Sequence, residues 1–234
     1  MNAILKREFR AYFLTPLGYV LIAAMAFFTN YYFFTYNLYG ATTDFSTLFS
    51  MLFPVVLFLV PVLTMRLLSE DKRLKTDQLL LTAPISRISI VLGKYLAALF
   101  VYLIAISFSM IDALIASIYA AVEWPVVIGH FAGLFLLGAA LIAVCMFLSG
   151  LTESQVIAAV LGFVVSLFLM LIDALSYVVS NAFLQEIFHY MSFNDRYVPF
   201  TYGILDFSNA LFFLSFAALF LFLSTAVLEK RRWS

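Results

Sequence analysis

The feature that most constrains this chain is a series of apolar stretches that are nearly free of charged residues. A helix needs about 20 mostly apolar residues to span a bilayer, and the stretches between successive charged groups reach that length repeatedly. We predict six spans, at about 17–38, 45–68, 94–116, 125–149, 153–175 and 207–228. The expected fold is therefore all-α, a polytopic membrane protein in which residues 1–234 form one transmembrane domain.

The composition excludes other classes of protein. Charged residues make up 11% of the chain and hydrophobic residues 65%, against roughly 25% and 45–50% in soluble domains. So few charges cannot cover a globular surface in water, which excludes a soluble enzyme, a nucleic-acid-binding protein and a disordered chain. The single cysteine, Cys145, excludes an intrachain disulfide and a cysteine-based metal cluster.

The basic residues are distributed very unevenly along the predicted topology. Six spans place both termini on one side, and all but Arg196 of the 13 Lys and Arg residues then fall on that side. Because cytoplasmic loops carry the excess of Lys and Arg, we predict that both termini are cytoplasmic.

Residues 1–16 precede the first predicted span and have the pattern of an amphipathic helix. At 100° per residue, their apolar and basic side chains fall on opposite halves of the helix. This pattern is typical of a helix that lies in the membrane interface, and Thr15-Pro16 is expected to end it. A simple topogenic anchor explains the same pattern, so both interpretations stay open.

The loop 66–94 combines mixed charges with a run of leucines on the predicted cytoplasmic side. Thr76 is a plausible N-cap for a short helix that Pro84 ends. Three leucines on a short surface helix need apolar cover, so we favour a segment that docks a partner over a solvated connector. The candidate docking residues are Glu70, Thr76, Asp77, Gln78, Leu79, Leu80 and Leu81.

Residues 174–206, on the opposite side, are too apolar for a plain loop and too polar for a clean span. Two short re-entrant or interfacial helices that turn near residues 192–199 fit this composition, since irregular backbone at membrane depth needs cover by protein or water. The segment is our candidate extracellular gate, formed by Phe188, His189, Tyr190, Asp195 and Arg196.

The chain lacks the motifs of an energy-converting enzyme. Its only Gly-Lys pair, Gly93-Lys94, lacks the upstream glycine of a P-loop. Energy for transport must then come from an ion gradient or from another polypeptide. Asp112 and Asp173 are candidate pathway residues, because carboxylates within spans are functional by default. Both lie near the outer ends of their predicted spans, however, where solvation by water is the simpler explanation.

Three motifs resemble those of ABC-2-type transporter permeases, particularly the gliding-motility-type subgroup. They are KREFRAYFLTPLGY at 6–19, the EDKR and LLLTAPIS pair within 70–86, and FTYGILD at 200–206 before a final span that ends in EKRRW. Lys75 and Gln78 stand where this family usually has glycine and glutamate.

The resemblance implies a membrane-spanning permease subunit of an ATP-binding-cassette exporter in a bacterial cell membrane. Residues 1–16 would be its interfacial connecting helix, 76–83 its ATPase-coupling helix, and 177–206 its extracellular re-entrant helices. The implied partners are a nucleotide-binding ATPase subunit, which holds ATP and Mg²⁺, and a second permease subunit of the same or another kind. The chain itself would be no enzyme and hold no cofactor. An ion-coupled carrier or channel and a membrane scaffold for a cytoplasmic partner are the alternatives.

Overall fold

The computed structural model describes residues 2–76, 86–178 and 182–230, and the regular structure in these ranges is helical throughout. Within them, six helical segments are long and apolar enough to cross a membrane. They are Pro16–Leu38, Ser46–Leu74, Arg87–Tyr119, Trp124–Leu151, Gln155–Ile172 and Phe207–Glu229. The predicted all-α class with six membrane-spanning helices is confirmed.

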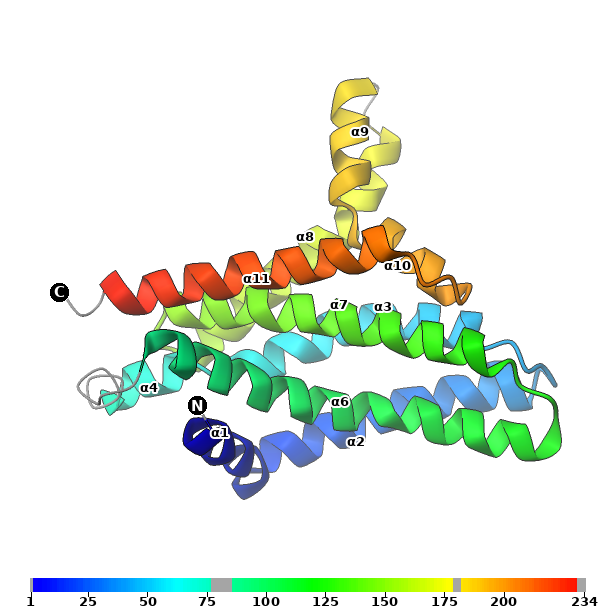
Figure 1. The fold of residues 1–234 in the computed structure, drawn as a ribbon, viewed down its shortest axis with the longest axis horizontal. Coiled ribbons are helices and arrows are strands. Elements are labelled where there is room, and N and C mark those ends of the chain that lie inside the picture. The colour runs from blue at the N-terminus through cyan, green and yellow to red at the C-terminus, as the bar shows by residue number, and fades with distance from the viewer. Residues whose placement is uncertain (1, 77–85, 179–181, 231–234) are drawn as a thin grey trace.

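The helices are numbered along the chain as in Figure 1. They are α1 (Asn2–Leu14), α2 (Pro16–Tyr32), the π-helical η1 (Phe33–Leu38), α3 (Ser46–Thr64), α4 (Ser69–Leu74), α6 (Arg87–Tyr119), α7 (Trp124–Leu151), α8 (Gln155–Val178), α9 (Ala182–Met191), α10 (Phe193–Thr201) and α11 (Phe207–Lys230).

The long helices lie side by side and give the bundle two distinct ends (Figure 1). We call one the termini end, where α1, α4, the start of α6 and the C-terminal end of α11 lie. The other is the loop end, formed by residues 39–45 and 120–123. α7 runs through the middle and packs against α3, α6, α8, α10 and α11. Close packing here requires glycine, since a Cβ on Gly133 would lie 2.3 Å from the Cβ of Phe200.

Two breaks in the helices lie near the termini end. Thr15 is extended (φ −105°, ψ 156°) between α1 and α2, and Pro16 opens α2, because proline fits the first turn but restricts the residue before it. The second break is the turn at 65–68, which separates α3 from α4. The second span, Ser46–Leu74, therefore runs from α3 through this turn into α4.

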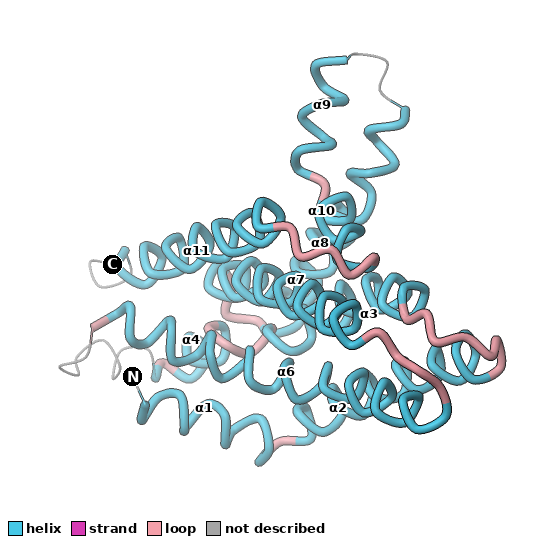
Figure 2. The backbone as a smooth tube through the Cα atoms, turned by 45° about the vertical axis from the view of Figure 1, so that its right-hand side comes forward, coloured by secondary structure: helices cyan, strands magenta, loops and turns pink. Residues whose placement is uncertain are grey.

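α9 and the C-terminal end of α8 project together to one side of the bundle, transverse to its long axis (Figure 2). α9 packs against α8, and the chain turns at Ser192, whose Oγ accepts a hydrogen bond from the N–H of Asp195 at 2.8 Å. This cap begins α10, which returns to pack on α3 and α7.

Candidate functional site

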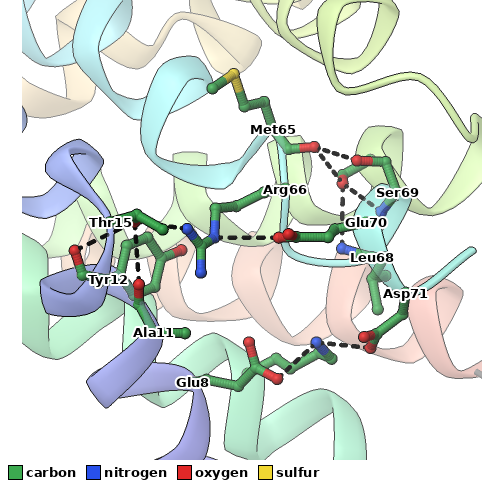
Figure 3. A network of polar contacts seen from close by, with 12 residues as sticks. Glu8, Ala11, Tyr12, Thr15, Met65, Arg66, Leu68, Ser69, Glu70 and Asp71 are labelled. Carbon is green, nitrogen blue, oxygen red and sulfur yellow. Dashed lines mark hydrogen bonds and ion pairs between the residues drawn. The ribbon is translucent and has the colours of Figure 1, made fainter. Parts of the chain in front are cut away.

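The centre of the candidate site is Lys94, whose side chain is 2% exposed. Helix α6 begins at Arg87 with Ser86 as its N-cap, which places Lys94 two turns inside the helix. Its ammonium lies 2.9 Å from Glu8 Oε1 and 2.8 Å from Asp71 Oδ2, and Figure 3 shows these carboxylates facing one another. Arg7 also contacts Glu8, with 3.2 Å between Nε and Oε1. We call Arg7, Glu8, Asp71 and Lys94 the charge network.

Glu8 reaches Lys94 because α1 packs directly on α6. Ile4, Glu8 and Tyr12 are buried at four-residue intervals, so they form one face of α1 that meets the bundle. The approach is close, since a Cβ on Gly93 would lie 3.0 Å from the Ile4 side chain. The interfacial helix is thus held by a buried ion pair as well as by apolar packing.

Asp71 connects the charge network to the end of α4. Its Oδ2 pairs with Lys94, while its Oδ1 accepts a hydrogen bond from the Thr76 hydroxyl at 2.9 Å. Between them, Lys75 has a left-handed conformation with φ of 55°, which residues with a Cβ adopt at a cost. Asp71 therefore links Thr76, just after α4, to Lys94 on α6 and to Arg7 on α1.

The charge network holds two cations and two anions, so its formal charges balance. Balance matters because taking an unpaired charge out of water costs several kcal/mol. Each carboxylate has at least one cation within 3 Å. The four side chains therefore form a closed ionic junction between α1, α4 and α6.

A second set of contacts joins the two helix breaks. Arg66, in the turn after α3, donates to the Thr15 hydroxyl at 2.8 Å and lies 5.0 Å above the Tyr12 ring. The Tyr12 hydroxyl donates to the carbonyl of Leu63 at 2.9 Å. Burial raises the pKa of Tyr12 well above its usual range, so the phenol keeps this proton. These contacts therefore link the two breaks directly.

The end of α7 supports the turn at 65–68 from the other side. Ser149 Oγ accepts hydrogen bonds from the N–H groups of Leu68 and Ser69 at 3.2 and 3.1 Å, and it donates to the carbonyl of Met65 at 3.0 Å. Lys72 also donates to the carbonyl of Gly150. The backbone groups that the break frees are satisfied by α7, as buried polar groups require.

The candidate docking residues are only partly described. Thr76 bonds Asp71, and Glu70 lies 3.4 Å from Arg66 in an ion pair one helical turn apart. The remaining candidates lie outside the described residues: Asp77, Gln78, Leu79, Leu80 and Leu81.

Four of the five candidate gate residues lie together at the junction of α9 and α10. His189 contacts Asp195 across the turn at Ser192. Arg196 lies 5.7 Å from the Tyr190 ring centre and donates to Asn209 Oδ1 at 3.1 Å. Phe188 is half-buried on α9. These contacts tie the junction to the start of α11.

The two candidate pathway carboxylates lie on different helices. Asp112 is on α6, 2% exposed, and its Oδ2 has no hydrogen-bond partner among the described residues. Asp173 is on α8, and its side chain lies outside the described part of the structure. Asp112 is therefore a buried carboxylate with one oxygen, Oδ2, unused as an acceptor within this part of the chain.

None of the four residues of the charge network was predicted from the sequence as a functional candidate. Lys94 was treated as the start of a span, although a helix begun at Arg87 places it two turns inside. Glu8 lies four residues from both Ile4 and Tyr12, and this spacing alone could have placed it on the buried face. No local pattern identifies Asp71 as their partner.

A comparison with protein families gives the class of this chain. The family described as ABC-2 family transporter protein matches residues 12–227, which include the charge-network residues Asp71 and Lys94. The chain belongs to this family, whose members are the membrane components of ABC-type transporters. No individual curated protein matches the chain. It is therefore a multi-pass membrane protein, and both its family and its six apolar helices support an ABC-type permease.

Proposed function

We propose that this chain is the permease subunit of an ABC-2-type exporter, driven by a separate nucleotide-binding ATPase subunit. Two permease subunits, identical or different, form the translocation path at their interface in a bacterial cell membrane. ATP and Mg²⁺ belong to the ATPase. The family match to residues 12–227 supports the permease class, and the sequence resemblance supports the gliding-motility-type subgroup.

The observation that carries the proposal is the charge network at the termini end. Residues 76–83 are the proposed coupling helix, and Thr76 at its start is hydrogen-bonded to Asp71. Asp71 in turn is paired with Lys94 on α6, which is paired with Glu8 on α1. A push on the coupling helix therefore reaches two other helices through charged contacts of less than 3 Å.

The transport step follows from this connection. Closure of the ATPase subunits on ATP displaces residues 76–83, and Asp71 carries the movement to Lys94. Because α1 packs on α6, the interfacial helix and the start of α6 move as one body. The break at 65–68 lets α4 change its angle while α3 stays packed on α7. This displacement opens the path between the two permease subunits.

The first experiment is purification of the tagged chain from its host in mild detergent, with mass spectrometry and an ATPase assay on the eluate. We expect a stoichiometric P-loop ATPase with vanadate-sensitive turnover. The double variant Leu79→Asp, Leu80→Asp should insert normally and lose the ATPase, since two carboxylates disfavour an apolar interface. Leu205→Asp, at a side chain that is 62% exposed before α11, is the matched control and should keep it.

An ATPase that co-purifies equally with the Leu79, Leu80 variant would remove residues 76–83 from the docking role. An eluate without any ATPase would contradict the proposal as a whole.

The second candidate function is an ion-coupled carrier, which the buried Asp112 favours. Carboxylates buried in spans commonly serve as ion or proton sites. An ion gradient would then drive transport in reconstituted vesicles without ATP, and Asp112→Asn would abolish it. A membrane scaffold, the third class, would bind an ATPase without any substrate-dependent turnover.

A further inference from the structure

A cavity of about 320 Å³ lies at the loop end, between residues 42–45 and the first turns of α7. Its lining includes Asp44, Glu123 and His130, together with the apolar side chains of Phe45 and Val127. Small-molecule sites have volumes of roughly 300–1,000 Å³ and combine apolar walls with a few directed polar groups. The cavity has the size and lining of a small-ligand site, at the opposite end of the bundle from the charge network.

His130 is one of the residues that line this cavity, and it has an unused hydrogen-bond acceptor. The side chain is 0% exposed, and its Nδ1 lies 2.7 Å from the carbonyl oxygen of Phe200. Since a carbonyl only accepts, Nδ1 carries the proton, and Nε2 of the neutral ring holds a free lone pair. Nε2 is buried and has no hydrogen-bond partner among the described residues. Stacking on Phe49, with 4.9 Å between ring centroids, fixes the ring in this orientation.

Two carboxylates at the rim give the cavity a negative potential. Asp44 Oδ1 accepts hydrogen bonds from the Ser46 hydroxyl and, at 2.8 Å, from the Ser46 N–H. These bonds lower the pKa of Asp44, so it is ionised at neutral pH. Glu123, also exposed, lines the same cavity. The residues that line the cavity include no Lys or Arg, so neither carboxylate is neutralised from within it.

The loop that carries Asp44 is ordered by its own hydrogen bonds. Asn37 is 4% exposed, and its Nδ2 donates to the carbonyls of Thr42 and Asp44 at 3.2 and 2.9 Å. The Thr42 hydroxyl accepts from the Asp44 N–H at 3.1 Å. The carboxylate is therefore held in position before any ligand arrives, which lowers the entropy lost on binding.

We propose that this cavity binds a small organic cation with a protonated amine. Its N–H group donates to Nε2 of His130, and its positive charge is balanced by Asp44 and Glu123. A metal ion fits less well, because the described residues hold no group of three His, Cys, Asp or Glu side chains suited to one. The proposal is independent of the ATPase and of the dimer.

The test is calorimetric titration of the purified full-length chain in detergent with 1,4-diaminobutane, with 1,4-butanediol as the uncharged probe of equal length. We expect saturable binding of the diamine and none of the diol. His130→Asn retains an N–H for the Phe200 carbonyl and removes the Nε2 lone pair. It should weaken diamine binding on the order of tenfold, as expected for loss of a hydrogen bond to a charged group.

The double variant Asp44→Asn, Glu123→Gln tests the rim independently, and it keeps an oxygen that can accept from Ser46. It should weaken diamine binding severalfold and remove its dependence on salt, since exposed charges are screened by salt. Glu186→Gln, at an exposed carboxylate on α9, is the matched control and should change nothing. Equal binding of the diol, no saturable binding of the diamine, or normal binding by both cavity variants would each overturn the proposal. If His130→Asn fails to fold, the double variant at the rim tests the proposal by itself.

Discussion

At the termini end, buried Lys94 lies within 3 Å of two carboxylates, whereas toward the loop end Asp112 Oδ2 and His130 Nε2 are buried with no hydrogen-bond partner among the described residues. The first arrangement is complete within the chain, so it can transmit force between helices but offers nothing to a ligand. The second leaves acceptors unused, so it can respond to a molecule or proton from outside. The two ends of one bundle are thus suited to coupling and to recognition.

The largest effect is expected from Lys94→Met. This variant leaves Glu8 and Asp71 with only Arg7 as a nearby cation, and loss of one partner from a buried ion pair costs about 3–5 kcal/mol. The thermal unfolding temperature of the purified chain should fall sharply. Lys6→Met removes an equal charge from an exposed position on α1 and should leave that temperature nearly unchanged. Equal behaviour of the two variants would show that the charge network is not a structural junction.

Asp112→Asn, in contrast, should stabilise the protein. The amide has almost the shape of the carboxylate and avoids burying an unpartnered ionisable oxygen, so we expect a gain of about 1–2 kcal/mol in the free energy of unfolding. Denaturation in detergent at neutral pH measures it. A loss of stability instead would mean that the Asp112 carboxylate has a partner in the folded protein, and the contrast between the two ends would weaken.

Lys75→Gly should stabilise the chain by roughly 1 kcal/mol. Lys75 has φ of 55° at the C-terminal cap of α4, where a Cβ costs about 1–2 kcal/mol and glycine does not, although glycine loses more entropy on folding. The unfolding temperature should rise slightly for this variant and stay unchanged for Lys75→Ala, which keeps the Cβ. A lower temperature for Lys75→Gly would indicate that the lysine side chain itself holds the junction.

The smallest effect is expected at the surface of the termini end. Arg87 and Glu229 form an ion pair between α6 and α11, with side chains 28% and 58% exposed. Exposed pairs contribute less than about 1 kcal/mol, so Arg87→Gln should barely shift unfolding, and high salt should remove the difference. A shift as large as that of Lys94→Met would mean that burial does not distinguish the two ion pairs.

The sequence predicted the six spans because the bilayer imposes a length and a composition that each span must meet by itself. It could not predict the junction between α1, α4 and α6, because Glu8 meets Lys94 only through tertiary packing. Lys94 was placed at a span boundary, since a charge normally lies at the interface. Its burial depends on two carboxylates that are distant in the chain, and no local sequence pattern indicates that they pair with it.

The unused acceptor of His130 could not be predicted from the sequence either. An isolated histidine in an apolar stretch predicts packing, and His130 is indeed packed on Phe49. Which ring nitrogen carries the proton depends on the carbonyl of Phe200, which lies 70 residues further along the chain. The acidic rim residues Asp44 and Glu123 were visible in the sequence, but they enclose a cavity only once two loops meet.

The pairing of Glu8 with Lys94 also sets an order of events during synthesis. The two residues are 86 positions apart, and a ribosome that adds about 5–20 residues per second needs roughly 4–17 s to cover that distance. Throughout that interval the first helix has been made and its buried partner has not. The N-terminal helix can therefore form this ion pair only after the start of α6 has been made, although it is the first helix of the chain to be synthesised.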